Sequence, residues 1–167
     1  MTPRASDLQP KLLTRVSVVR ESALAWYDRA RFGAASAVER QALRLCRQST
    51  RNRERGQSRA ALAAAEQAAL LYERVGQPRL QAFALNSAGL ALSEHDLIGA
   101  CRRYRRAVKL LEPHPHDQAR VLANLARALE RLGKTEQAAA ARARAAQAGS
   151  AENGRGARLA GAEAERA

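Results

Sequence analysis

The chain has 167 residues, room for one domain, and 46% of them are hydrophobic although only 4% are aromatic. Its formal net charge is +13, from 29 basic and 16 acidic side chains. No apolar run approaches the roughly 18 residues of a membrane-spanning helix, and charges interrupt the N-terminal region, so we expect neither a membrane span nor a signal peptide. Alanine and leucine, both strong helix formers, dominate the apolar residues and favour an all-α fold.

Apolar residues at helical spacing, separated by glycine and proline, predict about seven helices. The first covers 11–33 and ends at Gly33. The second follows a capping box of Ser36 and Glu39 and runs to about Arg55. The third covers about 58–75, and the fourth about 79–93.

The fifth predicted helix follows a turn at 94–96 and ends near Leu111, before two prolines. Asp117 is predicted to cap the sixth, which ends before Gly133. The seventh opens at Thr135 and fades near Gly149. Residues 149–167 lack apolar periodicity and are expected to form a disordered tail.

One alanine spacing recurs four times, with steps of 38, 39 and 38 residues between its first members. A fixed period in this range is typical of helical repeat arrays, whose units stack because none can bury its apolar face alone. The four copies are Ala23, Tyr27 and Ala30; Ala61, Ala65 and Ala68; Ala100, Tyr104 and Ala107; and Ala138, Arg142 and Ala145.

A preceding helix carries a second pattern, most regular in the last two copies: Leu45, Gln48, Ser49 and Asn52; Leu85, Ala88, Gly89 and Leu92; Leu122, Leu125, Ala126 and Leu129. Together the two patterns resemble the tetratricopeptide repeat over about residues 11–148. The period is longer than that family's usual length of about 34 residues. In this respect the chain is similar to repeats of bacterial transcriptional regulators and signalling proteins.

The resemblance implies an α-solenoid of antiparallel helix pairs, with an extension at 1–10 and a repeat domain at 11–148. The domain divides into a half repeat or cap at 11–33 and repeats at 36–78, 79–115 and 117–148. In this family the first helix of each pair lines the concave surface, where partners bind. The polar residues expected there are Arg47, Arg53, Asn86, Arg120, Asn124, Arg127 and Arg131.

Asparagine can pair with a peptide backbone and arginine with carboxylates, so the predicted function is binding of a protein or peptide, acidic in character. We expect a cytoplasmic adaptor or regulatory scaffold. Two alternatives remain open: a basic scaffold associated with nucleic acid, and a small secretion-type chaperone built from such repeats.

A basic stripe on the fifth predicted helix bears on the nucleic-acid alternative. It contains Arg102, Arg103, Arg105, Arg106 and Lys109, opposite the apolar face of the helix. The stripe is either a solvated outer face, the interpretation we prefer, or a phosphate-binding surface. Few aromatic residues are present to stack on bases, which weighs against the second interpretation.

No motif in the sequence indicates catalysis or a cofactor, so we expect a protein that is not an enzyme. His114 and His116 could hold a metal ion, but a proline-rich turn between repeats is the preferred explanation. Cys46 and Cys101 lie within helical patterns and are expected to be buried thiols rather than a disulfide.

Overall fold

The computed structural model describes the backbone of residues 37–164 and the side chains of residues 37–150. This range contains six α-helices and no strand: α2 (Ala37–Glu54), α3 (Ser58–Arg74), α4 (Pro78–Leu92), α5 (Leu97–Leu110), α6 (Pro115–Arg131) and α7 (Thr135–Ala164). The prediction of an all-α fold is therefore confirmed for these residues. The predicted extension at 1–10 and half repeat at 11–33 lie outside them.

Glycine and proline set several of the helix boundaries, as their backbone preferences require. Gly56, Gly76 and Gly133 follow helix ends with φ of 72°, 66° and 72°, a conformation that glycine adopts without a steric penalty. Pro78 and Pro115 lie in the first turns of α4 and α6, where a missing N–H costs nothing. These residues limit the helices to short segments joined by tight turns.

Asp117 does not cap α6, so that prediction is wrong. The helix begins three residues earlier, because Pro115 is suited to a first helical position and His114 takes the N-cap place. Asp117 lies inside the first turn instead, and its carboxylate pairs with Arg79 of α4. A negative charge still favours this end of the helix dipole, so the local electrostatic contribution is retained.

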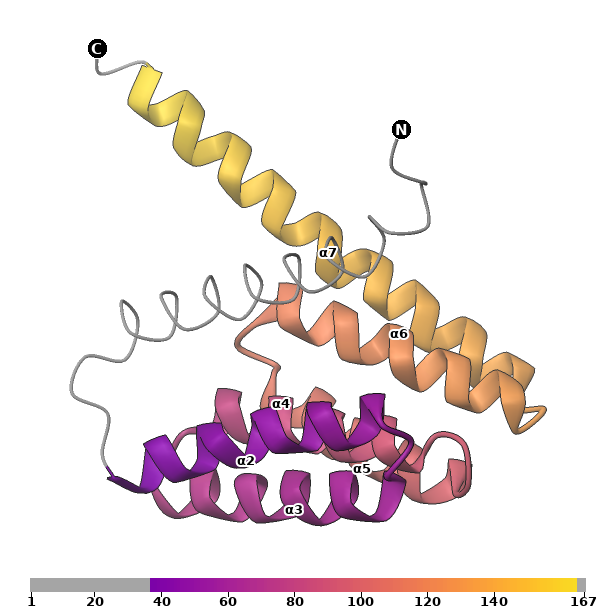
Figure 1. Ribbon diagram of the computed structural model, residues 1–167. Helices are drawn as coiled ribbons and strands as arrows, with labels where there is room; N and C mark the ends of the chain where they lie inside the picture. The colour runs from indigo at the N-terminus through magenta and orange to yellow at the C-terminus, as the bar shows by residue number, and fades with distance from the viewer. Residues whose placement is uncertain (1–36, 165–167) are drawn as a thin grey trace, which may run out of the picture. The chain divides into compact units, whose positions relative to one another are not determined.

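The seventh helix also differs from its prediction, because α7 continues to Ala164 instead of fading near Gly149. Alanine, arginine and glutamate continue through this segment, and their helix propensity carries the backbone past its glycines. Residues 149–164 are thus helical in the structure, whereas the sequence pattern predicts a disordered tail for 149–167. In Figure 1 this part of α7 extends beyond α6.

Each helix packs against the next one along the chain, and α2 also packs against α4 (Figure 1). Small side chains dominate the core. The first and last members of the repeated spacing are fully buried in α3 and α5: Ala61, Ala68, Ala100 and Ala107 are each 0% exposed. Alanine at these positions lets helix axes approach closely, while leucine and valine fill the remaining space.

Cys101 is buried and Cys46 is half-buried, and neither forms a disulfide within the part of the chain that the structure describes. Burial raises the pKa of Cys101, although Arg105 and Lys134 act in the opposite direction. A neutral, buried thiol is a poor nucleophile, so Cys101 serves as a small apolar group in the core.

None of the helices within residues 37–164 combines the length and the apolar character needed to cross a lipid bilayer.

Candidate functional site

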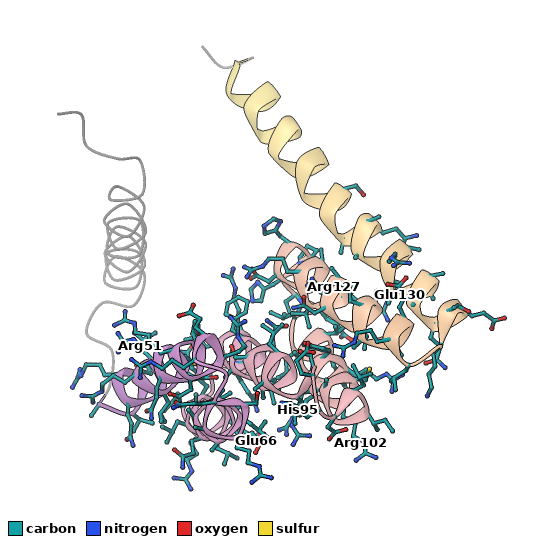
Figure 2. The ribbon with its side chains drawn as sticks, turned by 45° about the vertical axis from the view of Figure 1, so that its right-hand side comes forward. Arg51, Glu66, His95, Arg102, Arg127 and Glu130 are labelled. Atoms are coloured by element: carbon teal, nitrogen blue, oxygen red, sulfur yellow. The ribbon has the colours of Figure 1, made fainter. Side chains whose placement is uncertain are left out.

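The surface expected to bind a partner comes from α2, α4 and α6, and we call its seven predicted residues the first-helix face. The five arginines among them, Arg47, Arg53, Arg120, Arg127 and Arg131, have exposed side chains. Asn86 and Asn124 are half-buried. In Figure 2, Arg51 of α2 and Arg127 of α6 lie on one side of the helices, while Glu66 and Arg102 lie on the other.

Three residues of this face form a chain of hydrogen bonds between α4 and α6. Asn124 donates through Nδ2 to Oδ1 of Asn86 at 2.8 Å, and Arg127 donates to Oδ1 of Asn124. The amide N–H groups of Asn86 remain as donors. The structure therefore brings together Asn86, Asn124 and Arg127, and the asparagine pair holds the Arg127 guanidinium in place.

Further polar contacts join residues about one repeat period apart. Arg131 donates to the carbonyl oxygen of Ser93 at 2.6 Å, and it pairs with Glu94 at 3.1 Å. Arg79 donates through Nε to Asp117 at 2.6 Å.

Gln77 donates to Glu39 at 3.3 Å and so joins the turn before α4 to α2. Four contacts join residues 38 positions apart: Gln77 with Glu39, Arg79 with Asp117, Asn124 with Asn86, and Arg131 with Ser93. Polar groups one sequence period apart are therefore neighbours in space.

Tyr104 of α5 lies beneath this face and is 1% exposed. Burial raises its pKa to about 12, although Arg127 and, more weakly, Arg53 act in the opposite direction. Arg127 lies on α6 and Arg53 on α2, so positive charges from two helices of the face act on the phenol. Tyr104 is neutral at physiological pH and belongs to the core that supports the face.

The basic stripe of α5 is partly neutralised by α3. Arg103 pairs with Glu66, its Nε lying 3.1 Å from the carboxylate, and Arg106 pairs with Glu73 at 2.7 Å. Arg105 donates to the side-chain oxygen of Gln137 in α7 at 3.1 Å. Arg102 and Lys109 are exposed. The five residues therefore share a helix but do not form one uniform cationic surface.

These ion pairs are not predicted by the sequence analysis, although a signal is present. Glu66 and Arg103 are separated by 37 residues, close to the repeat period, so the repeat places opposite charges on neighbouring helices. Opposite charges at this separation in the sequence therefore indicate the contact between Glu66 and Arg103. The same holds for Arg131 with Glu94, which are 37 residues apart.

Among the residues whose side chains are described, no group of three or more His, Cys, Asp or Glu side chains is placed to hold a metal ion. His114 is the N-cap residue of α6, and Asp117 is engaged by Arg79. The structure thus places His114 at the start of α6 and Asp117 within its first turn.

The chain matches no protein-family model, no curated protein and no solved structure. The candidate site is therefore defined by its own geometry and charge.

Proposed function

We propose that this protein is a tetratricopeptide-like α-solenoid that binds a protein or peptide segment on its first-helix face. The observation that carries the proposal is the hydrogen bond between Asn86 and Asn124, which lie 38 residues apart on α4 and α6. It is what a repeat array requires, since equivalent polar positions of successive first helices come to lie side by side. The four contacts at this separation extend the same relationship from α2 to α6.

The charge of this surface supports an acidic partner. Helices α2, α4 and α6 together contain nine arginines and four acidic residues. Three of the acids are already engaged, Asp117 by Arg79, Glu130 by Arg142 and Glu39 by Gln77. Arginine forks bind carboxylates in two-pronged geometry, and the remaining Asn86 donors suit a backbone carbonyl.

The nucleic-acid alternative receives less support, because Arg103 and Arg106 of the basic stripe are used in ion pairs with α3. A phosphate would have to compete with two carboxylates that are already in contact. If binding nevertheless used this stripe, the affinity for a duplex would fall steeply with salt, by a log–log slope of about 0.9 per neutralised phosphate. Exchanging Arg102, Arg105 and Arg106 for glutamine would flatten that slope.

The experiment is capture of partners from lysate by the immobilised full chain, with and without nuclease, followed by affinity measurement on a captured protein. The test variant is Arg53→Gln with Arg127→Gln, which removes two exposed charges from the first-helix face. We expect retention of the partner after nuclease and an affinity several-fold weaker in this variant.

The matched control is Arg102→Gln with Lys109→Gln, which removes the same charge from exposed positions of α5. This control is expected to bind like the unmodified chain. Equal weakening in both variants would mean that net charge alone governs binding. Weakening only in the control would move the site to α5 and contradict the proposal.

A further inference from the structure

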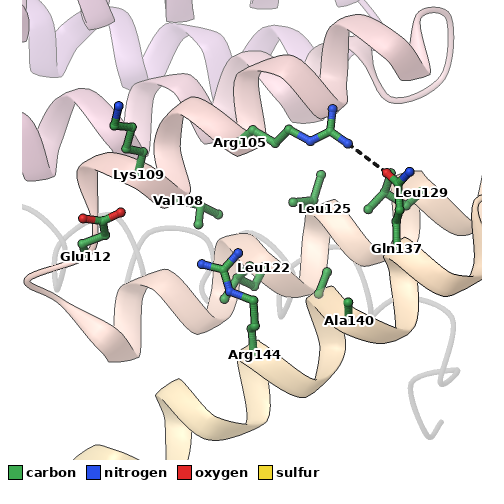
Figure 3. A pocket seen from close by; sticks show the side chains of 11 residues that line it. Arg105, Val108, Lys109, Glu112, Leu122, Leu125, Leu129, Gln137, Ala140 and Arg144 are labelled. Atoms are coloured by element: carbon green, nitrogen blue, oxygen red, sulfur yellow. Dashed lines mark hydrogen bonds between the residues drawn. The ribbon is translucent and has the colours of Figure 1, made fainter.

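A groove of about 440 Å³ lies between α5 and α7, with α6 as its floor (Figure 3). Its floor and inner wall are aliphatic, formed by Val108, Leu122, Leu125 and Leu129. Its rim is lined by Arg105 and Lys109 of α5, by Glu112 of the turn after α5, and by Arg144 of α7. The volume is within the range of small-molecule sites, about 300–1,000 Å³.

Comparison with the preceding pair of helices shows why this gap is open. Between α3 and α5, ion pairs of Glu66 with Arg103 and of Glu73 with Arg106 span the equivalent gap. In the register set by Ala61, Ala100 and Ala138, Arg105 takes the place of Glu66 and Ala141 that of Arg103. The acid and the base of the Glu66–Arg103 pair are both absent from the α5–α7 gap, whereas Glu73 and Arg106 have counterparts in Glu112 and Arg144. Among the described residues, Glu112 and Arg144 do not form an ion pair with each other.

The rim of the groove consequently carries more cations than carboxylates. Arg105 contacts only the amide oxygen of Gln137 among the described residues, and neither Lys109 nor Arg144 pairs with any of them. Glu112 is the single acid on the rim. The carboxylate of a bound ligand would pair with these cations, as Glu66 pairs with Arg103 one repeat earlier.

The lining also selects what accompanies that carboxylate. It includes no aromatic side chain for a ring to stack on, and Gln137, its one neutral polar side chain, already accepts from Arg105. Amides of an extended peptide or hydroxyls of a sugar that faced the aliphatic floor would have no partners there, at a cost of about 1–3 kcal/mol each. An aliphatic chain has no such groups and gains by burial.

We propose that the α5–α7 groove is a binding site for a fatty carboxylate, whose aliphatic chain lies on the leucine floor and whose head group meets the cationic rim. This site is separate from the first-helix face, since its rim belongs to α5 and α7. It requires no protein partner.

The test is a titration of the ¹⁵N-labelled full chain with octanoate, followed by amide chemical shifts, alongside acetate and 1-octanol. We expect saturable shifts around the groove with octanoate, none with acetate and weaker binding of octanol. Replacing Lys109 and Arg144 by glutamine should weaken octanoate binding by roughly two- to five-fold at low salt, as expected for exposed ion pairs. Octanoate and octanol binding equally well would overturn the role of the rim.

A second variant tests the location of the site without removing charge. Ala140 is exposed and lines the groove, so Ala140→Leu fills it while keeping a strong helix former in α7. Ala139→Leu is the control, because Ala139 is exposed on α7 but does not line the groove. We expect octanoate binding to be lost only in Ala140→Leu, with circular dichroism unchanged in both.

Equal binding by these two variants, or the absence of saturable shifts in the unmodified chain, would overturn the proposal. Saturable binding of an acidic, leucine-containing peptide to the groove in the absence of octanoate binding would also overturn it and make the occupant a protein segment. Because no captured protein is used, failure here leaves the proposed function of the first-helix face unaffected.

Discussion

The aromatic ring of Tyr104 in α5 lies against Gly89 of α4, in the space that a side chain at position 89 would occupy. A Cβ atom built on Gly89 would lie 2.8 Å from both Cδ1 and Cζ of that ring, well inside van der Waals contact. The absence of a side chain at 89 is therefore what allows α5 to bury its largest residue, which is 1% exposed. Glycine is required at position 89 because space is lacking there, and not because of backbone conformation, since the φ angle of Gly89 is not positive.

Gly89→Ala should therefore destabilise the protein, by about 1–3 kcal/mol for overpacking, less the gain from better helix propensity. Gly149→Ala is the matched control, because Gly149 lies in helix α7 with nothing within 4 Å of an added Cβ. This control should be neutral or stabilising by up to about 1 kcal/mol. Urea denaturation of both variants measures the difference, and a stabilising Gly89→Ala would refute the close contact.

Ala107→Leu tests the register of the repeat. Ala107 is 0% exposed in the core, so added methyl groups must displace neighbouring helices, at a cost of about 1–3 kcal/mol. Ala140→Leu adds the same volume at an exposed position and should change stability by less than about 0.5 kcal/mol. Thermal unfolding followed by circular dichroism compares them. Similar midpoints for the two variants would show that the register is wrong.

The ion pair between Arg79 and Asp117 should contribute more than those on the surface. The Asp117 side chain is 8% exposed and that of Arg79 is 29% exposed, so Asp117→Asn removes the charged partner of a guanidinium that is only partly accessible to water. We expect a loss of about 1–3 kcal/mol. Glu73→Gln breaks the pair with Arg106, in which both side chains are about half exposed, and should cost under about 1 kcal/mol. Urea denaturation gives both values, and the reverse order would contradict the burial argument.

Tyr104 should make the stability depend on pH in the alkaline range. Its pKa is raised by burial to about 12 in the folded state, against 10.0 for an ordinary tyrosine. The folded state therefore holds the proton that the unfolded chain releases, so this stabilisation is complete below about pH 10 and is lost as the pH rises towards 12.

Denaturation from pH 9 to 12 should consequently show a steeper loss of stability for the unmodified chain than for Tyr104→Phe, which keeps the ring without its titration. Groups other than Tyr104 titrate in both proteins and cancel in the comparison. Parallel curves would mean that the phenol ionises equally in the two states.

The helices were accessible to sequence reasoning because their signals are local. Gly56, Gly76 and Gly133 mark helix ends through φ, and apolar periodicity marks the buried sides of the helices between them. The alanine spacing also located buried positions correctly in α3 and α5, where it yields residues that are 0% exposed. The middle member of the last copy, Arg142, is exposed on α7, which has no following helix to cover it within the described range.

The candidate site was only partly accessible. The exposed arginines of the first-helix face follow from helical periodicity, but the contact between Asn86 and Asn124 does not, because it depends on how two helices are aligned. The basic stripe of α5 appeared uniform from spacing alone. Its partial neutralisation by Glu66 and Glu73 depends on the neighbouring α3, which a helical wheel of α5 omits.

The sequence by itself determined the all-α class, most helix boundaries and the repeat period, since these depend on interactions within a few residues of the chain and on composition. Tertiary structure alone decided which charges are paired, that Tyr104 lies against Gly89, and that a groove remains between α5 and α7. Those outcomes depend on distances between side chains about one repeat apart. Such distances are set by how closely alanine lets helices approach. Which charges meet also differs between repeats, because Arg105 stands at the position that Glu66 has in the preceding copy.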